Sequence, residues 1–153
     1  MARTFTLVTE THHWVEALFD LSLDIGAHVA SMHGSRERAV AGVTTGRIGL
    51  GETVTWKAWH LGIRFTMTSR ILELDRPHRF VDAQIAGPFR EFRHEHRFER
   101  LGDVTRMTDT ITLASPIFAP LVEPLILVPY LRRLIARRNA QLLALLDREA
   151  TTQ

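Results

Sequence analysis

The sequence predicts an α+β fold in which a curved, seven-stranded antiparallel sheet wraps around a long C-terminal helix, with two short helices after strand 1. Three observations lead to this prediction. Apolar and polar residues alternate from about residue 38 to residue 114, which is typical of strands. The joints between these strands are short and contain Gly or Pro, as in connections between antiparallel neighbours. The C-terminal segment instead repeats apolar residues at three- and four-residue spacings, which indicates an amphipathic helix.

The N-terminal elements are a strand followed by two short helices. Residues 3–10 alternate and are predicted as the first strand. Thr11 is the expected N-cap of a short helix, and Trp14 is expected on the buried face of that helix. A second short helix is predicted for residues 25–32.

Six further strands follow, and their joints fix their order along the chain. Turn signals stand at Gly62, at Arg76-Pro77, at Gly87-Pro88 and at Gly102-Asp103. Such tight joints place consecutive strands side by side and antiparallel. The predicted strands are residues 38–44, 52–61, 63–74, 79–86, 91–101 and 104–114.

The terminal helix is predicted over residues 130–147. Its arginines, at positions 132, 133, 137 and 138, are expected largely on the solvated outer face. Prolines 116, 120, 124 and 129 predict one or two kinked turns before the regular helix. The apolar stripe expected to face the sheet consists of Leu131, Leu134, Ile135, Leu142, Leu145 and Leu146. No linker or repeat interrupts the chain, so residues 1–153 are predicted to form a single domain.

The amino-acid composition argues against several classes of function. The absence of cysteine excludes disulfides, thiolate zinc sites and thiol catalysis. A net charge of +2 gives no support for nucleic acid binding. The longest apolar stretch, residues 116–131, is interrupted by Glu123 and four prolines, so we expect no stable membrane insertion. The N-terminus shows no signal-peptide pattern, and we expect a cytoplasmic protein, with its oligomeric state open and a homodimer possible.

Two histidines are predicted to face the protein interior. In the segment GPFREFRHEHRFER, residues 87–100, one strand face carries Arg93, Glu95, Arg97 and Glu99, a solvated set of charges. The opposite face therefore holds His94 and His96, between two phenylalanines. Histidines turned inward indicate a cavity with polar groups, because an unpaired buried polar group is costly.

Further polar groups are predicted near this histidine row. Asp109 shares an apolar row on the last strand, and the hairpin pairs that strand with the histidine strand. If Phe80 faces inward, Asp82 and Gln84 join the same polar set. His60 is expected to face inward on its own strand, as is Trp56. The remaining histidines, His12, His13, His28, His33 and His78, are expected at the surface or in loops.

The chain resembles a known superfamily in four stretches: GLGETVTWKAWHLG, ILELDRPHRFVD, GPFREFRHEHRFE and RMTDTITLASP. These stretches and the element order are similar to the START-like, or SRPBCC, superfamily, and within it to a bacterial subgroup related to polyketide cyclase/dehydrase sequences. The resemblance implies a helix-grip fold with a hydrophobic ligand cavity between the sheet and the terminal helix. It implies no particular activity, since the superfamily includes carriers and cyclases alike.

We therefore expect the protein to bind a small, mainly hydrophobic molecule between the sheet and the terminal helix, without a cofactor. The glycine-rich stretch GVTTGRIGLGETV precedes a strand, so it is predicted as a flexible loop at the cavity mouth rather than a phosphate loop. The expected ligand-binding residues are His94, His96, Asp109, Gln84, Asp82, His60, Trp56, Phe65, Phe89, Phe92, Met107, Leu127, Leu131 and Leu134.

Alternative functions remain open. The protein is a cyclase- or dehydratase-like enzyme if the candidate catalytic residues His94, His96 and Asp109 move a proton. It is an interaction module if the terminal helix docks a protein partner or a membrane. The His-x-His spacing also suits a metal ion with His60 or Asp109 as third ligand, but the third ligand is not fixed by sequence, and we expect no metal site.

Overall fold

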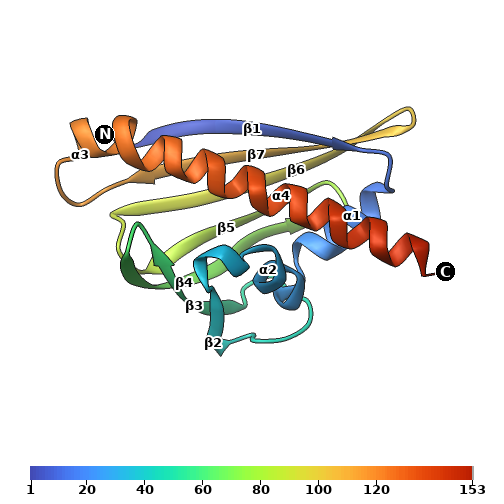
Figure 1. The fold of residues 1–153 in the computed structure, drawn as a ribbon, viewed down its shortest axis with the longest axis horizontal. Helices are drawn as coiled ribbons and strands as arrows, with labels where there is room; N and C mark the ends of the chain where they lie inside the picture. Colours follow the sequence, from blue (N-terminus) through green and yellow to red (C-terminus); the bar gives the residue numbers. More distant parts are fainter. Residues whose placement is uncertain (153) are drawn as a thin grey trace.

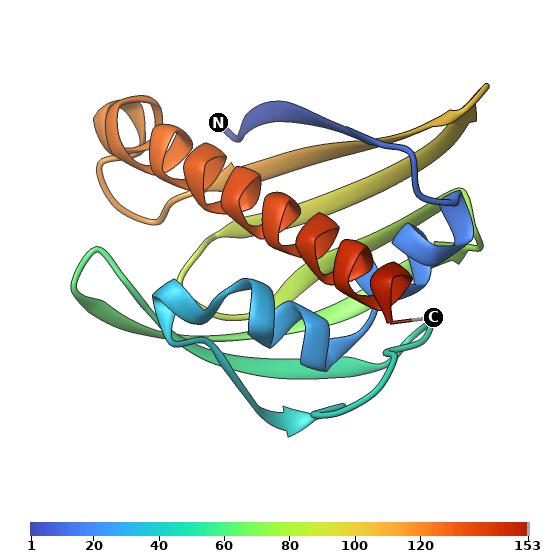
Figure 2. The same cartoon turned by 45° about the vertical axis from the view of Figure 1, so that its right-hand side comes forward.

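One antiparallel sheet of seven strands curves around the long helix α4, as Figures 1 and 2 show. The computed structural model describes residues 1–152. The elements are, in chain order, β1 (Arg3–Thr11), α1 (Val15–Ser22), α2 (Ile25–Ser31), η1 (His33–Ser35), β2 (Arg38–Gly42), β3 (Thr53–His60), β4 (Ile63–Asp75), β5 (Arg79–Ala86), β6 (Glu91–Leu101), β7 (Val104–Ala114), α3 (Ala119–Val122), η2 (Glu123–Leu127) and α4 (Val128–Thr151).

The strand order is β1-β7-β6-β5-β4-β3-β2, with every neighbouring pair antiparallel. All strands from β2 to β7 follow one another along the sheet, and only β1 crosses to the far edge to pair with β7. The predicted fold class is confirmed, and the bounds of β5, β6 and β7 agree with the predicted ranges. The ends of these strands could be predicted because Gly or Pro, which favour turns, stands in the connection on either side of each strand.

Irregular pairing bends the sheet. The register shifts once between β2 and β3 and twice between β4 and β5. A bulge bends its strand and increases the local twist. These shifts lie in the half of the sheet that curves toward α2 in Figure 2, and they leave the opposite half, β6 and β7, with an unbroken register.

Helix α4 joins two apolar clusters that together form the core. One cluster unites α1 and α2 with strands β3 to β7, and it reaches α4 through Leu146. The other unites β1 and β7 with Leu131 and Ile135 of α4. The predicted stripe of α4 therefore faces the sheet, and burying it is what orients the helix.

Two N-terminal predictions are wrong. Thr11 does not cap a helix, because it continues β1 and pairs with Thr105 of β7, and Trp14 takes the N-cap position of α1. Trp14 is 68% exposed, and the Arg100 guanidinium lies 4.7 Å from its ring centroid. The glycine-rich loop before β3, predicted to be flexible, is held to the segment between α1 and α2 by a backbone hydrogen bond, in which Ile48 N donates to Leu23 O over 3.1 Å.

The approach to α4 is irregular, as the four prolines predict. A single turn of α-helix, α3, is followed by one π-helical turn, η2, and a Pro stands near the start of each. Glu123 in this segment is buried and accepts a hydrogen bond from the backbone N–H of Ser115. Among the described residues, no helix is both long and apolar enough to cross a bilayer.

Replacing Leu142 by alanine should destabilise the protein by about 2–5 kcal/mol, because the side chain is fully buried on α4 and its removal leaves a cavity. The matched control is Leu125→Ala, since Leu125 is 70% exposed and its loss should change stability by about 0.5 kcal/mol or less. Urea unfolding measures both free energies. Equal effects in the two variants would contradict the assigned packing of α4.

Candidate functional site

A cavity of about 190 Å³ lies between the concave face of the sheet and helices α2 and α4. Its lining is mostly apolar, with polar groups gathered at a few places on the wall. Eleven of the residues predicted to bind a ligand line it: Trp56, His60, Phe65, Asp82, Phe89, Phe92, His94, His96, Leu127, Leu131 and Leu134.

Strand alternation places His94 and His96 on the cavity side of β6. Both side chains are buried, and Phe98 continues their row into the core. The register sets Asp82 of β5 opposite His94, and Asp109 of β7 opposite His96. Three neighbouring strands thus bring two imidazoles and two carboxylates to one place on the sheet, as predicted.

Asp109 is the centre of this polar cluster. Its side chain is fully buried, and one carboxylate oxygen accepts a hydrogen bond from His94 Nε2 over 2.8 Å. The same oxygen lies 2.9 Å from His96 Nδ1, an ion pair that is too bent to count as a hydrogen bond. The other oxygen accepts from Asn139 Nδ2 of α4 over 2.7 Å. A buried carboxylate needs such partners, because leaving it unpaired would be costly.

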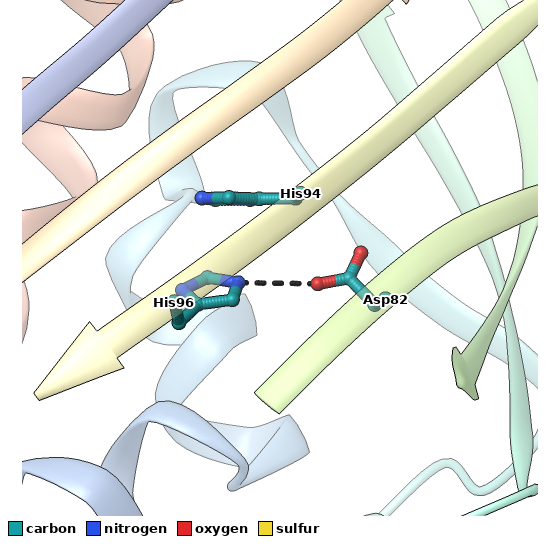
Figure 3. Close-up of side chains that lie close together, drawn as sticks. All are labelled: Asp82, His94 and His96. Atoms are coloured by element: carbon teal, nitrogen blue, oxygen red, sulfur yellow. Dashed lines mark hydrogen bonds and ion pairs between the residues drawn. The ribbon is translucent and has the colours of Figure 1, made fainter. Parts of the chain in front are cut away.

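His96 lies between two carboxylates. Its Nε2 is 3.1 Å from Asp82 Oδ2, the interaction drawn in Figure 3, while its Nδ1 faces Asp109. The Phe80 ring stacks on the His96 ring with 4.1 Å between the centroids, and the His94 ring centroid lies 3.7 Å away, two residues back along β6. The imidazole of His96 is therefore fixed in position by contacts to both its nitrogen atoms and its ring.

Helix α4 closes the cluster with two polar residues. Arg138 is only 3% exposed, and its guanidinium lies 3.8 Å from Asp109. Arg138 also donates to Asn139 Oδ1 over 3.2 Å. The prediction that the helix arginines lie on the solvated face is wrong for Arg138, although Arg132, Arg133 and Arg137 are exposed. The reason is that position 138 falls on the buried stripe, where Asp109 supplies an opposite charge.

The surroundings shift the pKa values of the cluster in definite directions. Burial raises the pKa of Asp109, but the hydrogen bond from His94, the close contact with His96 and the charge of both together outweigh burial and hold that pKa well below its usual value. Burial likewise raises the pKa of Asp82, and the His96 bond and nearby positive charges together lower it by more than burial raises it. For His96, burial lowers the pKa, and interactions with Asp109 and Asp82 raise it above its usual value.

The pKa of His94 shifts in the opposite direction. Burial, together with the neighbouring charge on His96, lowers the pKa of His94 despite its bond to Asp109. These directions favour ionised Asp82 and Asp109, a His96 that holds its proton more tightly than a free imidazole does, and a neutral His94. A neutral imidazole that donates through Nε2 retains a lone pair on Nδ1.

Two other polar pairs border the cavity. His60 Nδ1 lies 2.7 Å from the Tyr130 hydroxyl, and burial lowers the pKa of His60. His28 Nε2 lies 2.6 Å from the Glu37 carboxylate, and the Trp56 ring lies 4.4 Å from the His28 ring. The prediction of His28 as a surface or loop residue is wrong, because helix α2 turns it toward Trp56.

Three predicted binding residues do not line the cavity. Asp109 lies behind the histidines, as their hydrogen-bond and charge partner. Met107 is fully buried and contacts Ser22 of α1, so its side chain belongs to the core. Gln84 uses its amide on the backbone of Phe89, donating to the carbonyl oxygen over 2.8 Å and accepting from the N–H over 3.2 Å. It thereby positions Phe89 rather than a ligand.

Sequence reasoning missed Asn139, Tyr130 and Glu37. A signal for Asn139 is present, since it stands four residues after Ile135 on the buried stripe of α4. Tyr130 lies one residue before Leu131 and faces His60 of β3, a contact that depends on how the sheet curves. Such long-range partners have no local pattern.

Replacing Asp109 by alanine should destabilise the protein by about 3–5 kcal/mol, because it leaves the buried Arg138 guanidinium without a carboxylate and leaves His96 with Asp82 alone. Thr108→Ala, on the other face of the same strand, is the control and should cost about 1 kcal/mol or less. Chemical denaturation at neutral pH gives both values. A loss of about 1 kcal/mol or less in Asp109→Ala would show that the cluster contributes no charge pairing.

No protein-family model and no curated protein matches the chain. Solved structures do match it. The Zhui aromatase/cyclase from Streptomyces sp. R1128 matches with a TM-score of 0.79 and 15% identity, over 98% of this chain and 96% of that chain. The protein TTHA0849 from Thermus thermophilus matches with a TM-score of 0.73 and 19% identity, over 93% of this chain and 98% of that chain.

Ara h 8.0201 matches as well, with a TM-score of 0.66 and 13% identity, over 94% of this chain and 99% of that chain. At these identities the similarity concerns the fold, and site residues are not transferred. The strand order, the strand register and these structural similarities together show that the chain has a helix-grip fold.

Proposed function

We propose that this protein binds a small, mainly hydrophobic ligand in the cavity between the sheet and α4. The observation that carries the proposal is the cavity itself, about 190 Å³ of mostly apolar space with a polar cluster on its wall. A dry cavity of ~150 Å³ holds one benzene molecule, so this one suits a ligand with one or two rings. Pockets of this kind bind through apolar area and use few polar groups for orientation.

The lining suggests how such a ligand lies. Trp56, Phe89 and Phe92 offer flat aromatic contacts on the sheet side, and Leu131 and Ile135 offer aliphatic contacts on the α4 side. Of the two carboxylates in the polar cluster, Asp82 is the reachable one, because its side chain is 21% exposed while that of Asp109 is fully buried. As an ionised carboxylate, Asp82 accepts hydrogen bonds, so a ligand hydroxyl or amine is its expected partner.

The similarity to an aromatase/cyclase supports a ring-containing ligand, since the name of that protein refers to the formation of aromatic rings within the same fold. We propose cytoplasmic binding, which the absence of cysteine allows.

Binding of 2-naphthol tests the ligand proposal, because this molecule combines two rings with one hydroxyl. Wild-type protein should bind it saturably, measured by quenching of tryptophan fluorescence and by calorimetry. Ala58→Leu fills the cavity from its wall and should weaken binding at least about tenfold, or ~1.4 kcal/mol. Lys57→Leu, on the exposed face of the same strand, should bind as wild type does.

Circular dichroism and thermal melting confirm that both variants are folded before binding is compared. Absence of saturable binding to the wild-type protein, or unchanged binding in a folded Ala58→Leu variant, would contradict the proposal.

Proton transfer is a second candidate function, and the state of His94 favours it. His94 borders the cavity, is neutral, and is oriented by Asp109 through Nε2. A neutral imidazole held by a carboxylate is a competent general base, worth about 10²–10⁴-fold in rate. The expected chemistry is removal of a proton from a carbon next to a carbonyl, with the proton passing to His94 Nδ1.

Deuterium exchange into 2-tetralone measures this chemistry without knowledge of the natural substrate. Wild-type protein should accelerate exchange of the acidic ring protons in D₂O, followed by NMR, and His94→Ala should lose that acceleration. His60→Ala, which removes a different imidazole from the same cavity, is the matched control. Equal exchange rates in the wild type and a folded His94→Ala variant would rule out His94 as the base.

A further inference from the structure

Asp82, His94 and His96 lie close enough to share one metal ion. Each offers a ligand atom, and these atoms lie within 4.8 Å of one another. The histidines occupy alternate positions of β6, so their side chains project from the same face, and Asp82 projects beside them from β5 (Figure 3). The third ligand is thus Asp82, rather than the His60 or Asp109 considered from the sequence.

We propose that these three residues form a binding site for a divalent transition-metal ion of the Zn²⁺ type, open to the cavity. The proposal goes beyond ligand binding and does not depend on it. Two imidazoles and one carboxylate are a ligand set typical of catalytic zinc sites, whereas Mg²⁺ and Ca²⁺ prefer oxygen ligands alone.

A second layer of contacts supports the site. In metal sites, the ring nitrogen that does not bind the ion commonly faces a carboxylate, which fixes the orientation of the ring. Here Asp109 lies 2.8 Å from His94 Nε2 and 2.9 Å from His96 Nδ1. This leaves His94 Nδ1 and His96 Nε2 as the metal-binding nitrogens. His96 Nε2 would release its proton to solvent when the ion binds, and His94 Nδ1 would then not be free to act as a base. Asp109 is itself held by Asn139, over 2.7 Å.

Metal binding would require one side chain, His94, to change its orientation. His96 Nε2 and Asp82 Oδ2 are 3.1 Å apart, a separation that two ligands of one ion can adopt. The two imidazole ring centroids lie 3.7 Å apart, with an angle of 30° between the ring planes. Since a bound ion lies near the plane of each imidazole, the His94 ring must turn about its Cβ–Cγ bond, into the cavity that both rings border.

An ion in this position would have three protein ligands and a remaining coordination position facing the cavity. That position would take water or an oxygen atom of a bound molecule, as in catalytic rather than structural zinc sites. The site would therefore select ligands that carry a hydroxyl, carbonyl or carboxylate oxygen at one end.

Titration with Co²⁺ alone tests the site, using chelator-treated, full-length protein. Wild-type protein should bind one equivalent and develop the visible absorption bands of four- or five-coordinate Co²⁺. Asp82→Asn keeps the shape of the side chain but removes its charge, and it should weaken binding at least tenfold. His94→Gln should do the same and provides a second variant if the first is unstable.

The matched controls are His60→Ala, in the same cavity, and His13→Ala, which removes the exposed His13–Asp147 pair. Both should bind Co²⁺ as the wild type does. Absence of one-equivalent binding to the wild type overturns the proposal. Loss of binding in His13→Ala, or unchanged binding in folded Asp82→Asn and His94→Gln variants, overturns it equally.

Discussion

The charge pairing around Asp109 is the interaction on which the interior of this protein depends. A carboxylate buried between a sheet and a helix is strongly unfavourable unless opposite charge and hydrogen bonds surround it. His94, His96, Asn139 and Arg138 provide both, and they come from β6 and α4, on two sides of Asp109. Together with burial of the apolar stripe, the same contacts position α4 on the sheet.

This pairing also separates the roles of the two neighbouring histidines. The pKa of His96, between two carboxylates, is raised, whereas burial and the neighbouring His96, whose ring centroid lies 3.7 Å away, lower the pKa of His94. Environments that shift the pKa values of two neighbouring groups in opposite directions are characteristic of functional sites, although structural ion pairs produce such shifts too. What favours function here is position, since both rings border an apolar cavity rather than a filled core.

The fold could be predicted from local patterns, and the site only in part. Alternation on β6 is enough to turn His94 and His96 inward, because a one-residue slip would bury Arg93 and Glu95 instead. The Gly102-Asp103 hairpin then brings Asp109 to the same row. The spacing of the buried stripe on α4 could have indicated Asn139, whereas the contact of Tyr130 with His60 has no local signal, because it depends on the curvature of the sheet. Residue type alone places His28 and Arg138 in solvent, whereas His28 is held 2.6 Å from Glu37 and the buried Arg138 finds an opposite charge in Asp109.

Nitrogen-15 NMR of the two imidazoles tests the central claim most directly. At neutral pH, in protein freed of metal by a chelator, both ring nitrogens of His96 should show the chemical shifts of a protonated imidazolium. His94 should show one protonated nitrogen, Nε2, and one with a free lone pair. Two neutral rings, or a charged His94 beside a neutral His96, would contradict the account.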